Sequence, residues 1–348
     1  MTGHRCHPHG HRSCHGLLWT LTAFCLLLPV AVCNSEEAAV PESVRILSYN
    51  VRNFIRPDPD GLKDKRSREA VAETISHLAP DIALLYEMGD EKAVDELTSL
   101  LAGHDLTYPF STVVHGDDDV RHIAVLARWE PAEVDHKTDA YYNLEGHHVK
   151  VRRGFAYCRF SWGNGYVLHV VGAHLKSKAY HRLGQTDMRR YEARQLRYLV
   201  NDILETAPDA NLLIVGDLND APNSSPISAV CGRRYKYTRE LYDLRPVDKF
   251  GLGWTYWWQS GDIYSRIDYA MATFALLPEI DFDTTEIPFF SNWITASDHR
   301  PLVITVHTKD VAPPAEEEML EGFHRNIRMQ PPAPAETRIV GSRKVRHE

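Results

Sequence analysis

The chain has 348 residues, with 39 Lys and Arg against 47 Asp and Glu, a formal net charge of −8, and 43% hydrophobic residues. This composition is that of a globular protein and excludes a collagen, a coiled coil and a wholly disordered chain. The acidic balance argues against a protein that coats nucleic acid nonspecifically, but not against an enzyme that holds a metal with carboxylates.

The start of the chain has the pattern of a secretion signal. An almost wholly apolar run, Leu17–Val32, follows Arg5 and Arg12 and precedes small and polar residues. The run is shorter than the roughly 20 residues that span a bilayer. We therefore expect residues 1–33 to be a signal peptide and the mature protein to be secreted or periplasmic. An uncleaved anchor and lipidation at Cys33 are the weaker alternatives.

Next come a linker, a folded body and a tail. Residues 34–43 connect the leader to a body at 44–307, and prolines and glutamates then interrupt any periodicity. Such a composition buries too little apolar surface to order the chain, so we expect 308–348 to be disordered. Only Cys158 and Cys231 lie beyond the leader. Two cysteines make no disulfide framework, and whether they pair stays open.

Hydrophobic periodicity predicts the elements of the body. Many strands separated by few helices indicate a mixed α/β domain in which helices flank packed sheets. In chain order we predict a strand at 44–51, a helix at 64–77, a strand at 81–86, a helix at 91–101, strands at 122–128, 155–162 and 166–173, a helix at 187–205, and strands at 211–215, 268–271 and 302–306.

Polar residues able to bind a metal or move a proton lie at the ends of several predicted strands. Each alone is more often a turn former or an ordinary buried histidine. Six such positions together are too many for unrelated turns, so they predict a shared site. They are Asn50, Glu87, His174, Asp217 with Asn219, Asp268, and Asp298 with His299.

Their chemistry suits hydrolysis of a phosphate ester. The imidazoles of His174 and His299 supply acid and base near neutral pH. The amides of Asn50 and Asn219 can orient phosphate oxygens without adding charge. Oxygen ligands suit Mg²⁺ or Mn²⁺, with the candidates Glu87, Asp298, and Asn50 or Asp217.

The sequence segments around these site residues resemble those of the endonuclease/exonuclease/phosphatase superfamily, the deoxyribonuclease I-like fold. The resemblance covers about Val44 to His307 and implies an α+β fold: a four-layered α/β sandwich of two packed, mostly antiparallel sheets flanked by helices. It also implies metal-assisted attack of water on a phosphoester. The matching segments are LSYNV (47–51), DIALLYE (81–87), AHLKSK (173–178), GDLND (216–220), RIDY (266–269) and SDHRP (297–301).

The resemblance assigns roles residue by residue. Asp217 and Asn219 resemble the pair around the scissile phosphate, and Asp268 resembles the carboxylate that orients His299. His174 resembles the leaving-group acid. The metal-site residues are Glu87, Asn50 and Asp298, and the phosphate-binding candidates are Asn50, Arg153 and Lys176. Tyr86 stands where many members have Gln, which alters a neighbour of the metal site but leaves the ligand.

The substrate stays open within this superfamily. The leading interpretation is a secreted, Mg²⁺- or Mn²⁺-dependent nuclease, a monomer with no obligate protein partner, because the HLKSK segment resembles secreted bacterial nucleases. The alternatives are a phosphatase or phospholipase C-type enzyme acting on inositol phosphate or sphingomyelin, and an inactive binding module. Two further features could contact a substrate. Five basic residues form a candidate patch beside His174: Lys176, Lys178, Arg182, Arg189 and Arg190. The aromatic run Trp254–Trp258 is expected to pack in the core, with base stacking or lipid contact as alternatives.

Overall fold

Two six-stranded sheets form the body, and each is built around one parallel pair of strands. In the computed structural model, which describes residues 40–55, 63–232, 239–312 and 315, the other neighbouring pairs of both sheets are antiparallel. The first sheet has the order β15 (Ile280–Glu286), β16 (Leu302–His307), β1 (Ser43–Phe54), β2 (Ile82–Met88), β4 (His122–Ala127), β3 (Phe110–Val114). The second has the order β11 (Leu241–Asp243), β14 (Asp268–Thr273), β10 (Asn211–Asp217), β9 (Val167–His174), β8 (Phe155–Ser161), β5 (Glu133–Val134).

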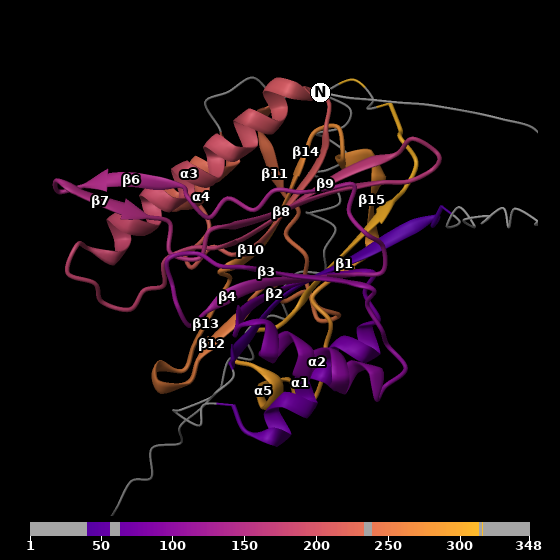
Figure 1. Cartoon of the computed structure of the whole chain (residues 1–348), viewed down its shortest axis with the longest axis horizontal. Coiled ribbons are helices and arrows are strands. Elements are labelled where there is room, and N and C mark those ends of the chain that lie inside the picture. Colours follow the sequence, from indigo (N-terminus) through magenta and orange to yellow (C-terminus); the bar gives the residue numbers. More distant parts are fainter. Residues whose placement is uncertain (1–39, 56–62, 233–238, 313–314, 316–348) are drawn as a thin grey trace, which may run out of the picture. The chain divides into compact units, whose positions relative to one another are not determined.

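Helices cover the outer face of each sheet (Figure 1). On the first sheet, Leu47 and Leu85 pack against residues of α1 (Lys65–Leu78) and α2 (Glu91–Ala102), and Ala296 of α5 (Trp293–Ala296) joins the same apolar cluster. On the second, Val171 and Leu212 pack against α3 (Gln185–Thr206) and α4 (Ser225–Cys231). The four layers predicted from the sequence are confirmed.

The two inner faces share one apolar core. Strand β1 shows why: Ile46 points between the sheets, whereas its neighbour Leu47 points to the helices, as the two-residue period of a strand requires. Leu84 and Leu213 meet Ile46 in the central layer. Burial of each such side chain contributes roughly 1.5–3 kcal/mol, so the central layer fixes the two sheets against each other.

Helix α1 illustrates how local sequence sets the boundaries. Asp64 caps its start by accepting a hydrogen bond from the Ser67 N–H at 2.7 Å. Ala79, with φ of 44°, ends it directly before Pro80. The predicted helix at 64–77 is therefore confirmed to within one residue at each end.

The elements that the sequence did not predict are mostly short or exposed. Besides β3, β5, α4, β11, β15 and α5, they comprise two hairpins and two 3-10 turns: β6 (Tyr141–Leu144) with β7 (His147–Lys150), β12 (Tyr256–Trp258) with β13 (Ile263–Ser265), η2 (Gln259–Gly261) and η3 (Leu277–Glu279). Cys158 and Cys231 are both buried thiols. No helix in the described part of the chain is long and apolar enough to cross a membrane.

Ordered structure extends beyond the predicted C-terminal end of the folded body at residue 307. The predicted signal peptide, most of the linker and the tail beyond 315 lie outside the described residues. Beyond His307, Thr308 donates its N–H to the Glu42 carbonyl, and Asp310 accepts from the Asn211 side chain at 2.9 Å. The Val311 N–H donates to Glu279 at 3.1 Å. Ordered contacts therefore continue at least to Val311.

Candidate active site

Three of the predicted site residues lie side by side on one rung of the second sheet. Asp217 of β10 is in register with His174 of β9 and with Asp268 of β14. All three are buried. The parallel strands β9 and β10 both end here. The parallel strands β1 and β2 of the first sheet end close by, since Asn50 of β1 contacts Asp217.

Asn50, at this end of β1, joins the two sheets. Its Nδ2 donates to Asp217 Oδ2 at 3.0 Å and to Glu87 Oε1 at 3.4 Å, while its Oδ1 accepts from the Arg52 N–H. Glu87 has a φ of 60°, a conformation that residues other than glycine rarely adopt. The Asn53 N–H donates to Glu87 Oε2 at 3.1 Å and holds it there.

The GDLN segment is shaped by close strand approach. A Cβ on Gly216 would lie 1.9 Å from the Ala173 carbonyl oxygen, so only glycine lets β10 lie this close to β9 directly before Asp217. Asn219 then takes a φ of 55° and donates its N–H to Asp217 Oδ1 at 3.0 Å. Its side-chain Nδ2 donates to the Leu175 carbonyl at 3.0 Å.

His299 reaches the rung from the loop before β16. Its Nδ1 lies 2.9 Å from Asp268 Oδ2, and its Nε2 lies 3.8 Å from Asp217 Oδ2. The Ser297 hydroxyl holds the loop by donating to the Asn50 carbonyl and accepting from the His299 N–H. The structure thus brings His299 and Asp268 together as the sequence predicts.

His174 faces Asp217 from the other side, with Nε2 3.6 Å from Asp217 Oδ2. Its ring packs edge-on against Tyr86 and is 1% exposed. His174 is therefore part of the interior, whereas His299 lines the cleft.

Burial and neighbouring charge shift the proton affinities of this group in opposite directions. Burial, with Arg153 and His299 nearby, holds the pKa of His174 well below its usual range. Burial also lowers the pKa of His299, but Asp268 and then Asp217 raise it, to about 10. Burial and Asp268 raise the pKa of Asp217. His174 is accordingly neutral and His299 holds a proton that faces Asp217.

The carboxylates of the site fit a divalent cation. Glu87 and Asp298 both line the cleft, with Arg52 Nε 3.6 Å from Asp298 as a counter-charge. Asn50 presents its amide nitrogen, not its oxygen, to Glu87 and Asp217. Within the described residues, one group of three side chains brings its possible ligand atoms within 4.8 Å of one another: Asp217, Asp268 and His299. This group can bind a metal, although two of its members were predicted to move or hold a proton.

A cleft of about 880 Å³ opens over the site. Arg153 lines it and is 6% exposed; Asp118 Oδ2 lies 3.2 Å from its Nε, yet Nε and Nη1 have no hydrogen-bond acceptor within the described residues. Lys176, also predicted to bind phosphate, does not line the cleft. Its Nζ donates to the Ala179 carbonyl at 2.9 Å and to Ser177, so the loop itself satisfies the ammonium.

A buried carboxylate on α3, which the sequence analysis missed, supports two loops of the cleft. Glu192 is fully buried and accepts from the Arg152 N–H at 3.1 Å and from the Lys176 N–H at 2.6 Å. Arg189, predicted to lie in a basic patch, is also buried and binds Asp220 at 2.9 Å. The patch is therefore not formed as predicted: of its five residues, only Lys178 lines the cleft.

Other cleft residues come from segments with no motif. Arg52 and Asn53 lie near the end of β1 at positive φ, and Arg121, just before β4, donates to Asn53 at 2.8 Å. The run Trp254–Trp258 was expected in the core, but only Thr255 is buried. Tyr256 and Trp258 line the cleft instead. The turn residues around the run were the one sequence feature that could have indicated a hairpin.

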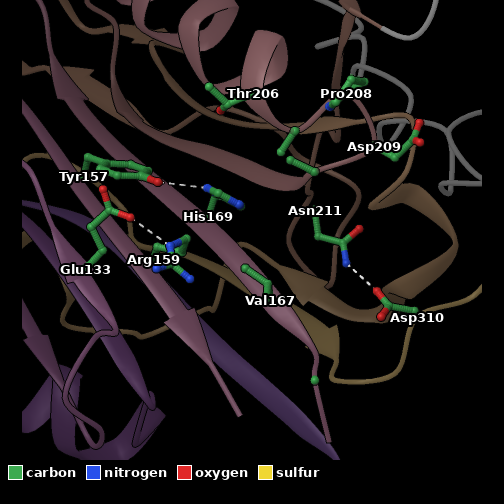
Figure 2. Close-up of a pocket in the computed structure, with 13 residues that line it drawn as sticks. Glu133, Tyr157, Arg159, Val167, His169, Thr206, Pro208, Asp209, Asn211 and Asp310 are labelled. Carbon is green, nitrogen blue, oxygen red and sulfur yellow. Dashed lines mark hydrogen bonds and ion pairs between the residues drawn. The ribbon is translucent and has the colours of Figure 1, made fainter.

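A second hollow, of about 660 Å³, lies at the opposite ends of β9 and β10 (Figure 2). Its polar groups are largely paired with one another: Arg159 with Glu133, Tyr157 with His169, and Asn211 with Asp310, as the dashed lines show. None of the predicted site residues lines it.

Comparisons with known proteins agree with this geometry. A family model described as "Endonuclease/Exonuclease/phosphatase family" matches residues 47–299. No curated protein sequence matches the chain. An endonuclease/exonuclease/phosphatase from Bacteroides vulgatus has a similar structure at 15% identity and a TM-score of 0.57, over 77% of this chain and 100% of that one.

Two further solved structures share the fold. Truncated TDP2 from Caenorhabditis elegans has 18% identity and a TM-score of 0.51, over 76% of this chain and 97% of that one. Sphingomyelinase C from Streptomyces griseocarneus has 19% identity and a TM-score of 0.51, over 77% of this chain and 100% of that one. At these identities the likeness is one of fold alone.

Proposed function

The chain belongs to the endonuclease/exonuclease/phosphatase family, and from this premise we propose that it is a secreted, divalent-metal-dependent nuclease that hydrolyses phosphodiester bonds with water as the nucleophile. The family and the site are those of a phosphoester hydrolase. The proposed substrate is nucleic acid, and the proposed working form is a monomer.

One observation carries the phosphate assignment. Arg153 is a buried guanidinium whose charge acts on His174; its Nε is ion-paired with Asp118 at 3.2 Å, but its Nη1 has neither an ion pair nor a hydrogen-bond acceptor within the described residues. An unsatisfied buried donor is costly, and a charge-assisted bond to a phosphoryl oxygen removes that cost. Glu192 supports this placement because it holds the neighbouring Arg152 N–H.

The remaining residues fit a hydrolytic role. A divalent ion held by Glu87 and Asp298 would supply Lewis-acid stabilisation of the phosphoryl oxygens. Asp268 holds His299 in one tautomer, so that the Nε2 of the ring faces Asp217 and the cleft. Asn219 donates to Asp217 and fixes its orientation. Because burial holds the pKa of His174 low while that of His299 is raised to about 10, His299 is the proposed proton donor to the leaving group in place of His174. His174 holds Asp217 from the other side.

The charge around the cleft favours a substrate with several phosphates. Arg52, Arg121, Arg153 and Lys178 all line it. Three carboxylates, Glu87, Asp217 and Asp298, line the cleft as well, and a divalent ion would offset two of their charges. The four cations then still exceed the remaining carboxylate and a single phosphodiester, and a nucleic acid backbone supplies the additional anions. A binding module without activity is disfavoured, because Glu87, His174, Asp217, Asn219 and His299 are all present. Asn219 donates to Asp217 at 3.0 Å, and the Nε2 atoms of His174 and His299 lie 3.6 and 3.8 Å from its carboxylate.

A second candidate function is that of a phospholipase C-type enzyme. It rests on Trp258 and Ile263, two exposed apolar side chains that line the cleft and that a lipid surface could contact. Inositol phosphates are a further alternative, because the same basic residues could bind their phosphates.

The test is a substrate panel with the mature protein in Mg²⁺: plasmid DNA, RNA, sphingomyelin vesicles and inositol phosphates. We expect hydrolysis of DNA or RNA, lowered by 10²-fold or more in Arg153→Ala. Arg159→Ala, an arginine paired with Glu133 away from the cleft, is the matched control and should retain activity. Turnover of sphingomyelin or inositol phosphates without turnover of DNA or RNA would contradict the proposal.

A further inference from the structure

The β12–β13 hairpin has two faces with different tasks. Its register pairs Tyr256 with Ser265, Trp257 with Tyr264, and Trp258 with Ile263. Because side chains alternate along a strand, the middle pair points away from the outer two pairs. The rings of Trp257 and Tyr264 stack, with centroids 5.7 Å apart and planes at 8°. Tyr264 also lies against Trp254, and Trp257 lies against Trp293. This face anchors the hairpin to the body.

The other face is turned to the cleft. Tyr256, Trp258, Ile263 and Ser265 all line it. Tyr256 lies against the His299 ring, with centroids 4.8 Å apart, and forms a backbone bridge with the same residue. One register step further out, Trp258 is 50% exposed and Ile263 is 49% exposed. An apolar surface therefore begins where the catalytic residues end.

Gly261 sets the place of the Trp258 ring. A Cβ on Gly261 would lie 2.4 Å from two carbons of the indole, so the ring lies directly over the turn. Any larger residue there would displace the ring. The turn thus supports one face of the indole, and half of the side chain remains accessible.

The tip of the hairpin is polar. Residues 259–262, Gln-Ser-Gly-Asp, are all exposed, and Asp262 accepts a hydrogen bond from the Trp257 indole at 3.1 Å. A hairpin that enters a lipid surface leads with apolar side chains, whereas this one would lead with a carboxylate. Its apolar pair lies behind the tip, on the side that faces the cleft.

We propose that Trp258 and Ile263 form a stacking subsite for the nucleobase next to the scissile phosphate of an unpaired nucleic acid strand. This proposal rests on the proposed nuclease function and adds where the base binds. An aromatic surface beside a positively charged groove is the combination that binds single strands, since every base has a face to stack. Here Arg121, Arg153 and Lys178 supply the charge and the hairpin supplies the surface.

Two chromogenic phosphodiesters test the subsite. The p-nitrophenyl ester of thymidine 5′-phosphate and methyl p-nitrophenyl phosphate have the same leaving group and charge and differ by the nucleoside. In both, water adds to phosphorus and p-nitrophenolate leaves. We expect the protein to prefer the thymidine ester, and Trp258→Ala to lower the ratio of the two kcat/KM values about 10-fold, the usual range for one stacked base.

Gly261→Ala should lower the same ratio in the same direction, because it displaces the indole without removing it. Tyr198→Ala, an equally exposed aromatic on α3 that does not line the cleft, should leave the ratio unchanged. An unchanged ratio in Trp258→Ala, with the methyl ester still cleaved, would overturn the subsite alone. Cleavage of neither ester by an unaltered protein that does hydrolyse DNA or RNA would also overturn the subsite alone, whereas failure on DNA, RNA and both esters would overturn the nuclease proposal and the subsite with it.

A lipid role has a separate readout. Trp258→Ala is also compared with the unaltered protein for sedimentation with sphingomyelin vesicles. If the substitution abolishes vesicle binding and leaves the ester ratio unchanged, the hairpin contacts lipid and the base-stacking proposal is wrong. Absence of vesicle binding in both proteins, with the lowered ester ratio, supports the proposal.

Discussion

His299 and Asp268 meet through a 2.9 Å contact between Nδ1 and Oδ2, although they lie on different segments of the chain. Both side chains are buried, so the carboxylate is the charge that fixes the tautomer of the ring. Asp268 is in turn held by its strand, in register with Asp217. The pair acts as one unit in this arrangement, and each residue depends on the other for its role.

For this pair we predict strongly non-additive kinetic defects. His299→Ala and Asp268→Asn should each lower kcat by about 10²-fold or more, the range for loss of a positioned acid or base. The double variant should be little worse than either single variant, because the second substitution removes a residue that has already lost its partner. A double-mutant cycle on one substrate measures this, and strictly additive defects would refute the pairing.

His174→Ala should affect both rate and stability. Loss of the imidazole that holds Asp217 from one side should lower kcat by about 10²-fold or more, the range for disturbing a positioned acid or base. The side chain is 1% exposed and packs against Tyr86, so its truncation leaves a cavity and should lower the free energy of unfolding by about 1–3 kcal/mol. Steady-state kinetics measure kcat, and chemical denaturation followed by fluorescence measures the free energy of unfolding. An unchanged unfolding midpoint would show that the interior closes around the missing ring.

Activity should depend on Mg²⁺ or Mn²⁺. Glu87 and Asp298 offer oxygen ligands, and the ligand type favours a hard cation. EDTA should abolish hydrolysis, excess Mg²⁺ or Mn²⁺ should restore it, and Zn²⁺ should not restore it fully. The measurement is the hydrolysis rate after dialysis and readdition of each ion. Full turnover after exhaustive chelation is the result that would contradict this expectation.

The segment after β16 should matter for stability up to Val311 and no further. The sequence predicts that everything after about Thr308 is dispensable, but Asp310 and Val311 make hydrogen bonds to Asn211 and Glu279. A chain ending at Thr308 should therefore melt lower than one ending at Ala315, while both retain the catalytic rate, because these contacts lie away from the cleft. Equal melting temperatures for the two chains would show that the contacts contribute nothing.

Glu279 should make the protein less stable as the pH rises from about 4.5 to about 7. Burial raises its pKa from 4.5 to about 7, with Asp310 adding to the effect and the Tyr166 hydroxyl and Val311 N–H opposing it. Between these values the folded protein holds a proton that the unfolded chain has released, so stability falls as pH rises.

The variant Glu279→Gln isolates this effect. Its amide can accept from Val311 and donate to Tyr166, and it stays neutral at every pH. Relative to the unaltered protein, it should gain stability between pH 5 and pH 8 by on the order of 1 kcal/mol. Urea titrations at a series of pH values measure the difference. A difference that is constant with pH would show that Glu279 titrates normally in the folded state.

Local sequence was sufficient for the longer central elements and the identity of most site residues. The apolar runs before Asn50, Glu87, His174 and Asp217 predict strands, and the polar residues that end those runs predict the site. These features are local, because side-chain period and strand ends depend on neighbours within a few positions.

The meeting of those residues depends on long-range contacts. Asn50 and Asp217 are 167 positions apart, and only the packing of two sheets places their side chains 3.0 Å from each other. Lys176 lies two residues after His174, yet its ammonium turns into its own loop, because the Ala179 carbonyl satisfies it there. No periodicity in the sequence encodes either outcome.

The residue patterns by themselves therefore determined a mixed α/β domain, its longer central strands and the chemical groups at their ends, and the motifs they carry implied the α+β sandwich. The tertiary structure decided which cations reach the cleft, that Glu192 supports two of its loops, and that the aromatic run at 254–258 forms a hairpin wall instead of core. The physical reason is that backbone preference and burial are written in short segments, whereas the direction of a loop side chain is set by whichever partner the rest of the chain brings to it.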